Sequence, residues 1–350
     1  MALTTERKKK YDELEERVGN TPLIEITADS RFNVPRGNRI FAKKEYCNPT
    51  GSHYDRYWVR LLRVLEEKDD IDPRLSSFPL LETSTGNSGA AFAWTCRELG
   101  YPCEVFIPGD MPAARIKQIQ YYQAKVTYSP KEEYVAGLIG YFREYIKEHP
   151  REYMITNHAN DQKDGVSAIY ELGKEIICDL EKMNVSSIDC FVSALGNGLT
   201  TRFIEQAFND KYSGKTVLYG MEPYESPTVY QNIFPEKYRS IFHDVKPSGK
   251  HDLIGTGPGK TDFAFPNMQK VIESGKIKDI FLEKSDDWKR RQRELAEYLN
   301  ENVGHTSAAC LDAAIRLVEE NPRMRNKNIV IIFYDADWKY SDDFPHKYEN

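Results

Sequence analysis

The sequence lacks any apolar run long enough to cross a membrane. Its longest, residues 329–334, has the length of a buried strand, whereas a transmembrane helix needs about 20 apolar residues. The first residues lead directly into a lysine run at residues 8–10 and then into acidic residues, without the apolar core of a signal peptide. We therefore expect a cytoplasmic protein without a membrane partner.

The six cysteines include no Cys-x-x-Cys pair, so we expect buried free thiols rather than a disulfide framework or a metal site. A basic excess is also missing. The 48 lysines and arginines against 54 acidic residues leave a net charge of −6, which argues against a nucleic-acid partner. Apolar residues form 40% of the 350 residues, enough for one or two buried cores.

Segments of strand length alternate with segments of helical length along most of the chain. This alternation predicts an α/β fold with parallel sheets covered by helices, and the length favours two sheets over one. Residues 224–262 lack periodicity and are expected to be a long excursion that serves as a lid or an interface. The predicted strands are 39–43, 79–83, 103–107, 125–128, 188–195, 216–221 and 328–334, and the predicted helices are 1–20, 55–67, 88–99, 113–123, 131–148, 166–182, 200–208, 288–300 and 310–319.

Two loops rich in glycine and hydroxyl residues each follow a predicted strand and precede a predicted helix. They are residues 83–89, Thr-Ser-Thr-Gly-Asn-Ser-Gly, and residues 196–200, Gly-Asn-Gly-Leu-Thr. Unpaired N–H groups and the positive end of a helix dipole favour a carboxylate or a phosphate at such a position. The alternative for either loop is an ordinary βα turn.

Residues 255–261, Gly-Thr-Gly-Pro-Gly-Lys-Thr, have a composition similar to that of a nucleotide-binding P-loop, but not its spacing. The pattern requires four residues between its first glycine and Gly-Lys-Thr, and that position holds Ile254. No buried strand precedes the segment either. We reject a P-loop and keep a nucleotide-hydrolysing enzyme only as a weaker alternative.

Residues 48–56, Asn-Pro-Thr-Gly-Ser-His-Tyr-Asp-Arg, follow the predicted strand 39–43. Pro49 and Gly51 predict a turn here, and Ser52 or Asp55 is expected to cap the next helix.

Taken together, these segments resemble the fold type II pyridoxal-phosphate (PLP) enzymes. That family includes cysteine synthase, cystathionine β-synthase, threonine synthase and the tryptophan synthase β chain, and the cysteine synthase branch is the most similar. The matching segments follow the family's order from about residue 19 to about residue 340. They are similar to the N-terminal signature (19–23), the PLP-lysine segment (48–56), the asparagine loop (85–89), the phosphate loop (196–200) and the segment that faces the pyridine nitrogen (304–309).

The resemblance implies a cofactor-phosphate domain of residues 1–44 plus 161–350 and a smaller substrate-loop domain of residues 45–160, with the ligand in the cleft between them. It also implies PLP as cofactor, an amino acid as substrate, β-elimination or β-replacement as reaction, and a homodimer. Asn87 would contact the ring hydroxyl and Thr306 the pyridine nitrogen. The implied phosphate donors are the main-chain N–H groups of Gly196, Asn197, Gly198 and Leu199 with the Thr200 hydroxyl, and the implied carboxylate site is Ser84, Thr85 and Ser88.

Tyr54 stands where the family has its Schiff-base lysine. A phenol cannot form an imine, and with an ordinary pKa of about 10 it is a poor base at neutral pH. PLP would then be held by non-covalent contacts alone, unless another lysine reaches it. The candidates are Lys43, Lys44 and Lys260, although the first two also fit an ordinary strand with one or both lysine heads in solvent.

Three explanations of Tyr54 stay open: natural divergence, an engineered substitution, and a relocated lysine. The aromatic neighbours Tyr46, Tyr57 and Trp58 favour natural divergence, because they indicate an adapted pocket. The functional hypotheses are accordingly an active PLP enzyme, an inactive PLP- or amino-acid-binding regulatory subunit, and an enzyme that uses the anion loops for another phosphate-bearing ligand.

Overall fold

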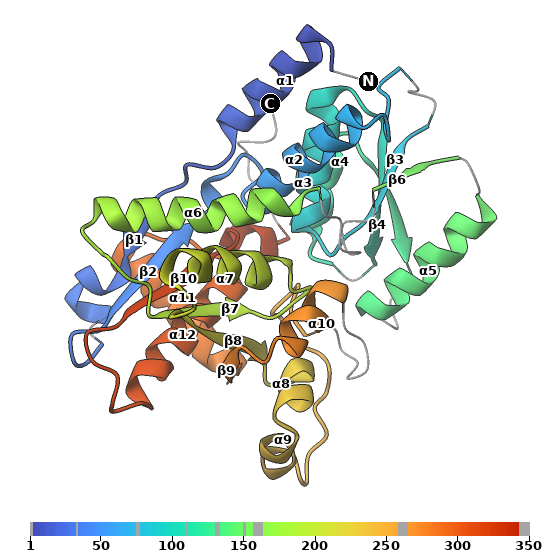
Figure 1. Ribbon diagram of the computed structural model, residues 1–350. Helices are drawn as coiled ribbons and strands as arrows, with labels where there is room; N and C mark the ends of the chain where they lie inside the picture. The colour runs from blue at the N-terminus through green and yellow to red at the C-terminus, as the bar shows by residue number, and fades with distance from the viewer. Residues whose placement is uncertain are drawn as a thin grey trace. The chain divides into compact units, whose positions relative to one another are not determined.

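The computed structural model describes residues 3–32, 34–74, 78–109, 111–129, 134–149, 152–156, 164–257 and 265–342 (Figure 1). The chain forms two compact units. Unit 1 comprises residues 1–19, 46–168 and 336–350, and unit 2 comprises residues 20–45 and 169–335.

Both ends of the chain belong to unit 1, whereas the division implied by the resemblance assigned residues 1–44 and 161–350 to one domain. The N-terminal helix is held by Glu66, whose carboxylate accepts hydrogen bonds of 2.7 and 2.6 Å from the Arg7 guanidinium and one of 2.8 Å from the Tyr11 hydroxyl. Near the C-terminus, the Ser341 carbonyl accepts a hydrogen bond of 3.2 Å from the Ala114 N–H. Such contacts between distant segments leave no local pattern in the sequence.

Unit 1 contains a four-stranded, wholly parallel sheet of order β5-β4-β3-β6. Helix α5 lies on one face of this sheet, and α2, α3 and α4 lie on the other (Figure 1). The elements are α1 (Thr5–Arg17), α2 (Tyr54–Glu67), β3 (Leu80–Thr83), α3 (Asn87–Leu99), β4 (Cys103–Pro108), α4 (Ala113–Tyr121), β5 (Lys125–Ser129), α5 (Tyr134–Glu148), β6 (Met154–Ile155) and the 3-10 helix η5 (Asp337–Tyr340).

Unit 2 contains a six-stranded sheet of order β1-β2-β10-β7-β8-β9, in which only the β1–β2 pair is antiparallel. Helices cover both faces (Figure 1). The elements are β1 (Leu23–Glu25), β2 (Arg39–Lys44), α6 (Val166–Lys182), whose first residues belong to unit 1, β7 (Cys190–Ala194), α7 (Leu199–Tyr212), β8 (Val217–Pro223), α8 (Thr228–Ile233), α9 (Pro235–Ile241), α10 (Pro266–Glu273), β9 (Ile277–Glu283), α11 (Ser285–Leu299), α12 (His305–Glu319) and β10 (Asn328–Phe333), with short 3-10 helices at Ile26–Ala28, Ser30–Phe32 and Glu45–Cys47.

The α/β prediction is confirmed in both units. Central strands such as β10, whose residues 329–333 are fully buried, show the continuous apolar pattern of a parallel sheet covered on two faces. Parallel strands place their carboxyl ends along one edge of each sheet. The glycine-rich segment 83–89 follows β3 at that edge in unit 1, and the segment 196–200 follows β7 at that edge in unit 2.

Several elements differ from the prediction. β6, α10 and β9 were missed, and α8 and α9 lie in the stretch expected to lack periodicity. α12 begins at His305, whereas the prediction placed its start at residue 310. The true start was missed because the residue before it, Gly304, has no side chain that could cap the helix and so mark its beginning. The six cysteines, all among the described residues, form no disulfide, but Cys47 and Cys178 are exposed rather than buried. No helix in the described ranges is long and apolar enough to span a membrane.

Candidate functional site

The segment that carries Tyr54 is a tight turn leading into α2. Gly51 has φ +79°, which favours glycine, and the carboxylate of Asp55 accepts hydrogen bonds from the N–H of Thr50 (2.7 Å) and from its hydroxyl. The predicted capping of α2 by Ser52 or Asp55 is wrong, because α2 has no side-chain cap and Asp55 closes the turn instead. Tyr54 is the first residue of the helix.

Of the predicted aromatic neighbours of Tyr54, Tyr57 contacts its ring directly and Trp58 packs behind Tyr57. The ring of His53 lies 4.4 Å from that of Tyr54, and Tyr57 meets Tyr54 edge-on at 6.5 Å. Trp58 packs edge-on against Tyr57, and both are fully buried. Buried aromatic side chains of α2 therefore lie on one side of residue 54.

The candidate carboxylate site follows β3 and opens α3. The hydroxyl oxygen of Ser84 accepts hydrogen bonds from the N–H groups of Gly86 (3.0 Å) and Gly89 (2.7 Å). The hydroxyl oxygen of Ser88 accepts one of 2.9 Å from the indole of Trp58. Both hydroxyls act as acceptors here, so each keeps its hydrogen to donate to a carboxylate at the positive end of α3.

In unit 2 the glycine loop follows β7 and opens α7. Gly198 has φ +85°, and a Cβ there would lie 2.3 Å from the N of Met268, so only glycine fits. The Leu199 N–H donates to the side-chain oxygen of Asn197 at 3.0 Å. This predicted phosphate donor therefore already has a local partner, which an incoming phosphate would replace.

Hydrogen bonds through Tyr334 join the end of β7, just before the glycine loop, to the start of α12. The hydroxyl of Tyr334 accepts a bond of 3.1 Å from the N–H of Ala194, two residues before the loop. The N–H of Tyr334 donates to the hydroxyl of Ser307 at 2.9 Å, and the N–H of Gly304 donates to the Asp335 carbonyl at 2.8 Å. Unit 2 thus brings two of the predicted segments, 196–200 and 304–309, to one edge of its sheet. Sequence reasoning did not select Tyr334, whose contact lies 140 residues away.

Thr306 is buried, at 6% exposure, and its hydroxyl has no hydrogen-bond partner among the described residues. An unsatisfied buried hydroxyl costs about 1–3 kcal/mol, so such groups are rare and usually await a ligand or water. A pyridine nitrogen accepts one hydrogen bond and matches this donor. The residues of unit 2 therefore fit PLP.

The candidate replacement lysines are engaged elsewhere. Lys43 is fully buried in unit 2, where its Nζ lies 2.6 Å from carboxylate oxygens of both Glu175 and Asp179. Lys44 pairs with Glu301 at 2.7 Å. Lys43 therefore does not reach solvent, Lys44 is only partly buried, and the amines of both lysines are engaged by carboxylates rather than free to form an imine. Lys260 lies outside the described residues.

The structure adds a buried lysine that the sequence did not single out. Lys339, in η5, is fully buried, and its Cε lies 3.2 Å from the position that a Cβ of Gly51 would occupy. Its Nζ lies 5.3 Å from the ring centroid of Trp338. The residues around Lys339 carry no pattern that predicts its burial, because the side chain packs against Gly51, which is far away in the sequence.

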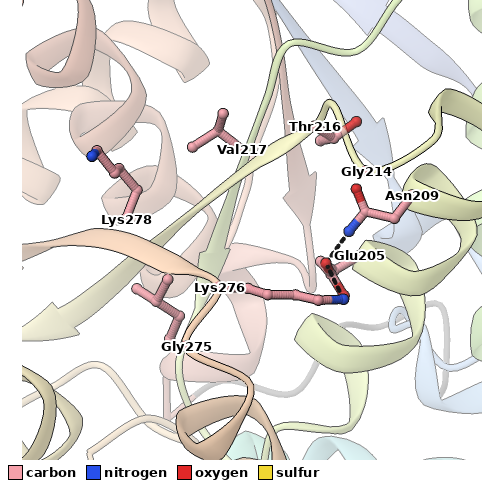
Figure 2. A pocket seen from close by; sticks show the side chains of 9 residues that line it. Glu205, Asn209, Gly214, Thr216, Val217, Gly275, Lys276 and Lys278 are labelled. Carbon is pink, nitrogen blue, oxygen red and sulfur yellow. Dashed lines mark hydrogen bonds and ion pairs between the residues drawn. The ribbon is translucent and has the colours of Figure 1, made fainter.

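A cavity of about 540 Å³ lies at the amino-terminal ends of β8 and β9, the edge of the sheet opposite to the glycine loop (Figure 2). Lys276 pairs there with Glu205 at 2.9 Å, and Asn209 donates to the same carboxylate. Because it lies at the edge of the sheet away from residues 196–200, the cavity is not part of the candidate site. Across the described ranges, no group of three or more His, Cys, Asp or Glu residues could hold a metal ion.

The sequence profile described as "Pyridoxal-phosphate dependent enzyme" matches residues 14–335, which is most of the chain. The chain belongs to this family. Its relatives include cysteine synthase A of Salmonella typhi, which is 27% identical over 95% of this chain and 94% of that protein. The PLP-dependent character expected from the sequence is thereby confirmed, as is its similarity to the cysteine synthase branch. The names of these relatives give no support to an inactive member.

Solved structures agree on the fold. An O-acetylserine dependent cystathionine β-synthase from Helicobacter pylori is 22% identical, with a TM-score of 0.78 and coverage of 98% of each chain. A cysteine synthase from Entamoeba histolytica is 24% identical, with a TM-score of 0.75 and coverage of 97% of this chain and 92% of that one. At these identities the likeness concerns the fold.

Proposed function

We propose that this family member binds PLP without an internal lysine and acts on an amino acid by β-elimination or β-replacement. The observation that carries the proposal is the buried, unpartnered hydroxyl of Thr306 on the same sheet edge as the glycine loop. The names of its relatives, cysteine synthases among them, support an amino acid as the substrate class.

PLP supplies an electron sink for negative charge at the α-carbon of a bound amino acid. The main-chain donors of residues 196–199 and the Thr200 hydroxyl would hold its phosphate at the start of α7, and Asn87 would contact the ring hydroxyl. Thr306 is a neutral partner for the ring nitrogen. Such a partner disfavours full protonation of the ring, which suits β-elimination.

The substrate carboxylate would be bound by Thr85 and by the hydroxyl hydrogens of Ser84 and Ser88, with the dipole of α3 adding positive potential. Tyr54 takes the lysine's place at the start of α2. A phenol at neutral pH donates a hydrogen bond and does not act as a strong base, so Tyr54 would offer a hydrogen-bond donor at this position and no imine-forming amine.

The test is an absorbance titration of the purified protein with PLP, followed by borohydride reduction and peptide mapping. We expect a saturable spectral change with no label on any lysine. A label on a specific lysine would contradict non-covalent binding and reveal a relocated Schiff base. The absence of any spectral change would contradict PLP binding and turn the search to other phosphate-bearing ligands.

The proposal includes two finer expectations, a homodimer and a cytoplasmic location. Light scattering on the eluted protein tests the first, since a dimer has twice the chain mass of 40.5 kDa. Fractionation of the source cells tests the second.

A further inference from the structure

Helix α4 presents two buried polar side chains to the main chain of unit 1. Arg115 and Gln118 are 2% and 1% exposed, and their spacing of three residues places them on one helix face. Both donate to main-chain carbonyls in the loops that carry the candidate site residues.

Arg115 is bound to the loop that opens α3. Its Nη1 donates to the Thr85 carbonyl at 3.2 Å, and its Nε donates to the Lys339 carbonyl at 3.3 Å. Its guanidinium lies 4.5 Å from the ring centroid of Tyr340. A Cβ on Gly86 would approach the Arg115 Cδ to 2.5 Å, and Gly86 has φ +138°. The arginine therefore lies directly against the backbone of this loop, and only glycine leaves room for it.

Gln118 is bound to the turn before Tyr54. Its Nε2 donates to the Thr50 carbonyl at 2.8 Å, while the N–H and hydroxyl of Thr50 are held by Asp55. The turn is thus fixed from two sides, by α4 and by the first turn of α2.

We propose that Arg115 and Gln118 are positioning residues that hold the Tyr54 turn (residues 50–54) and the carboxylate loop (residues 84–89) in one fixed relation. The planar fork of Arg115 sets the orientation of the Thr85–Gly86 peptide, and hence the direction of the donors that follow it. Small misplacements of binding groups are costly in rate, so this helix governs both amino-acid binding and the geometry at residue 54. The inference rests on the proposed function in assigning substrate and cofactor to these loops, whereas the contacts themselves do not depend on it.

The test uses the full chain saturated with PLP, with L-serine as the amino-acid probe. Hydrogen–deuterium exchange of the two loops and calorimetric binding of L-serine are compared for R115A, R115K and Q118A. The control is R97A, because Arg97 is exposed and lies 5.5 Å from the ring centroid of Tyr121 at the far end of α4.

We expect R115A to raise exchange in both loops and to weaken L-serine binding about 10- to 100-fold, as the loss of charged hydrogen bonds predicts. R115K keeps the charge but not the fork, so exchange should stay raised. Q118A should raise exchange in the Tyr54 turn and, less strongly, in the carboxylate loop. R97A should leave both loops as in the wild type.

Three results would overturn the inference. The first is a rise in exchange that R115A shows in only one of the two loops. The second is an equal rise in R115A throughout unit 1, including β4, and the third is wild-type exchange in both loops of R115K. If the wild-type protein binds neither PLP nor L-serine, the proposed function fails, and the exchange measurements still decide whether α4 positions the two loops.

Discussion

The indole Nε1 of Trp58 donates a hydrogen bond of 2.9 Å to the hydroxyl oxygen of Ser88. Trp58 is fully buried and Ser88 is 5% exposed, so the bond is shielded from water. It ties α2, whose first residue is Tyr54, to the first turn of α3. The residue that replaces the lysine and the predicted carboxylate site therefore share one rigid support within unit 1.

Replacement of Trp58 by phenylalanine removes this bond and part of a buried side chain. We expect W58F to lower the free energy of unfolding by about 2 kcal/mol and to weaken L-serine binding about ten-fold. Chemical unfolding and calorimetry measure the two effects. W94F is the matched control, because Trp94 is also buried and lies on α3. An equal loss of L-serine binding in W94F would show that the bond to Ser88 is not the cause.

A lysine at position 54 tests whether the rest of the pocket is intact. Tyr54 is only partly buried, so Y54K should fold, and its amine should be labelled at residue 54 after PLP and borohydride treatment. Peptide mapping by mass spectrometry gives the answer. Y54F, which has the same ring and no amine, should remain unlabelled. An unlabelled Y54K that still binds PLP would show that residue 54 does not reach the aldehyde.

The sequence predicted those parts of the protein whose signal is local. Buried strands such as residues 329–333 are continuous apolar runs, and the two anion loops combine glycine with hydroxyl residues at a strand–helix junction. Their order along the chain was enough to indicate the family. The edge strand β9, Ile277–Glu283, was missed because its apolar residues are interrupted by charged ones.

Residues that act across the chain could not be found in this way. Arg115 bonds to the carbonyl of Lys339, and Tyr334 bonds to Ala194, so neither contact has a spacing that a sequence pattern records. Burial of Lys43 was missed for a related reason. Its partners Glu175 and Asp179 lie on a helix more than 130 residues away, and they neutralise a charge that would otherwise stay in solvent.

Thr306 allows the cofactor to be tested without activity. T306V replaces the hydroxyl by a methyl group of similar size, so without PLP it should unfold no more easily than the wild type, because the hydroxyl makes no bond among the described residues. The affinity of T306V for PLP should be about ten-fold lower than that of the wild type, since the ring nitrogen loses its hydrogen-bond donor. T306S keeps the hydroxyl and should bind as the wild type does. Equal PLP affinity of T306V and the wild type would contradict the assigned role.

A buried carboxyl group at the end of β8 makes the stability of unit 2 depend on pH. Glu222 is fully buried, and it accepts hydrogen bonds from the N–H groups of Val229 (3.0 Å) and Tyr230 (2.8 Å) at the start of α8. Burial raises the pKa of Glu222 to about 7, because desolvation of the charged form outweighs these hydrogen bonds.

The folded state therefore holds a proton on Glu222 between pH 4.5, its ordinary pKa, and about pH 7, whereas the unfolded chain has released it. Since the folded state binds more protons in this window, the free energy of unfolding should fall as the pH rises through it, by up to about 3 kcal/mol. Unfolding by denaturant at a series of pH values measures this slope. E222Q cannot titrate, so the fall in its free energy of unfolding across this window should be smaller than that of the wild type by up to about 3 kcal/mol. E236Q, at an exposed glutamate on α9, should show the same pH dependence as the wild type. Identical slopes for E222Q and the wild type would show that Glu222 keeps its ordinary pKa and is charged in the folded protein at neutral pH, held by the N–H groups that open α8.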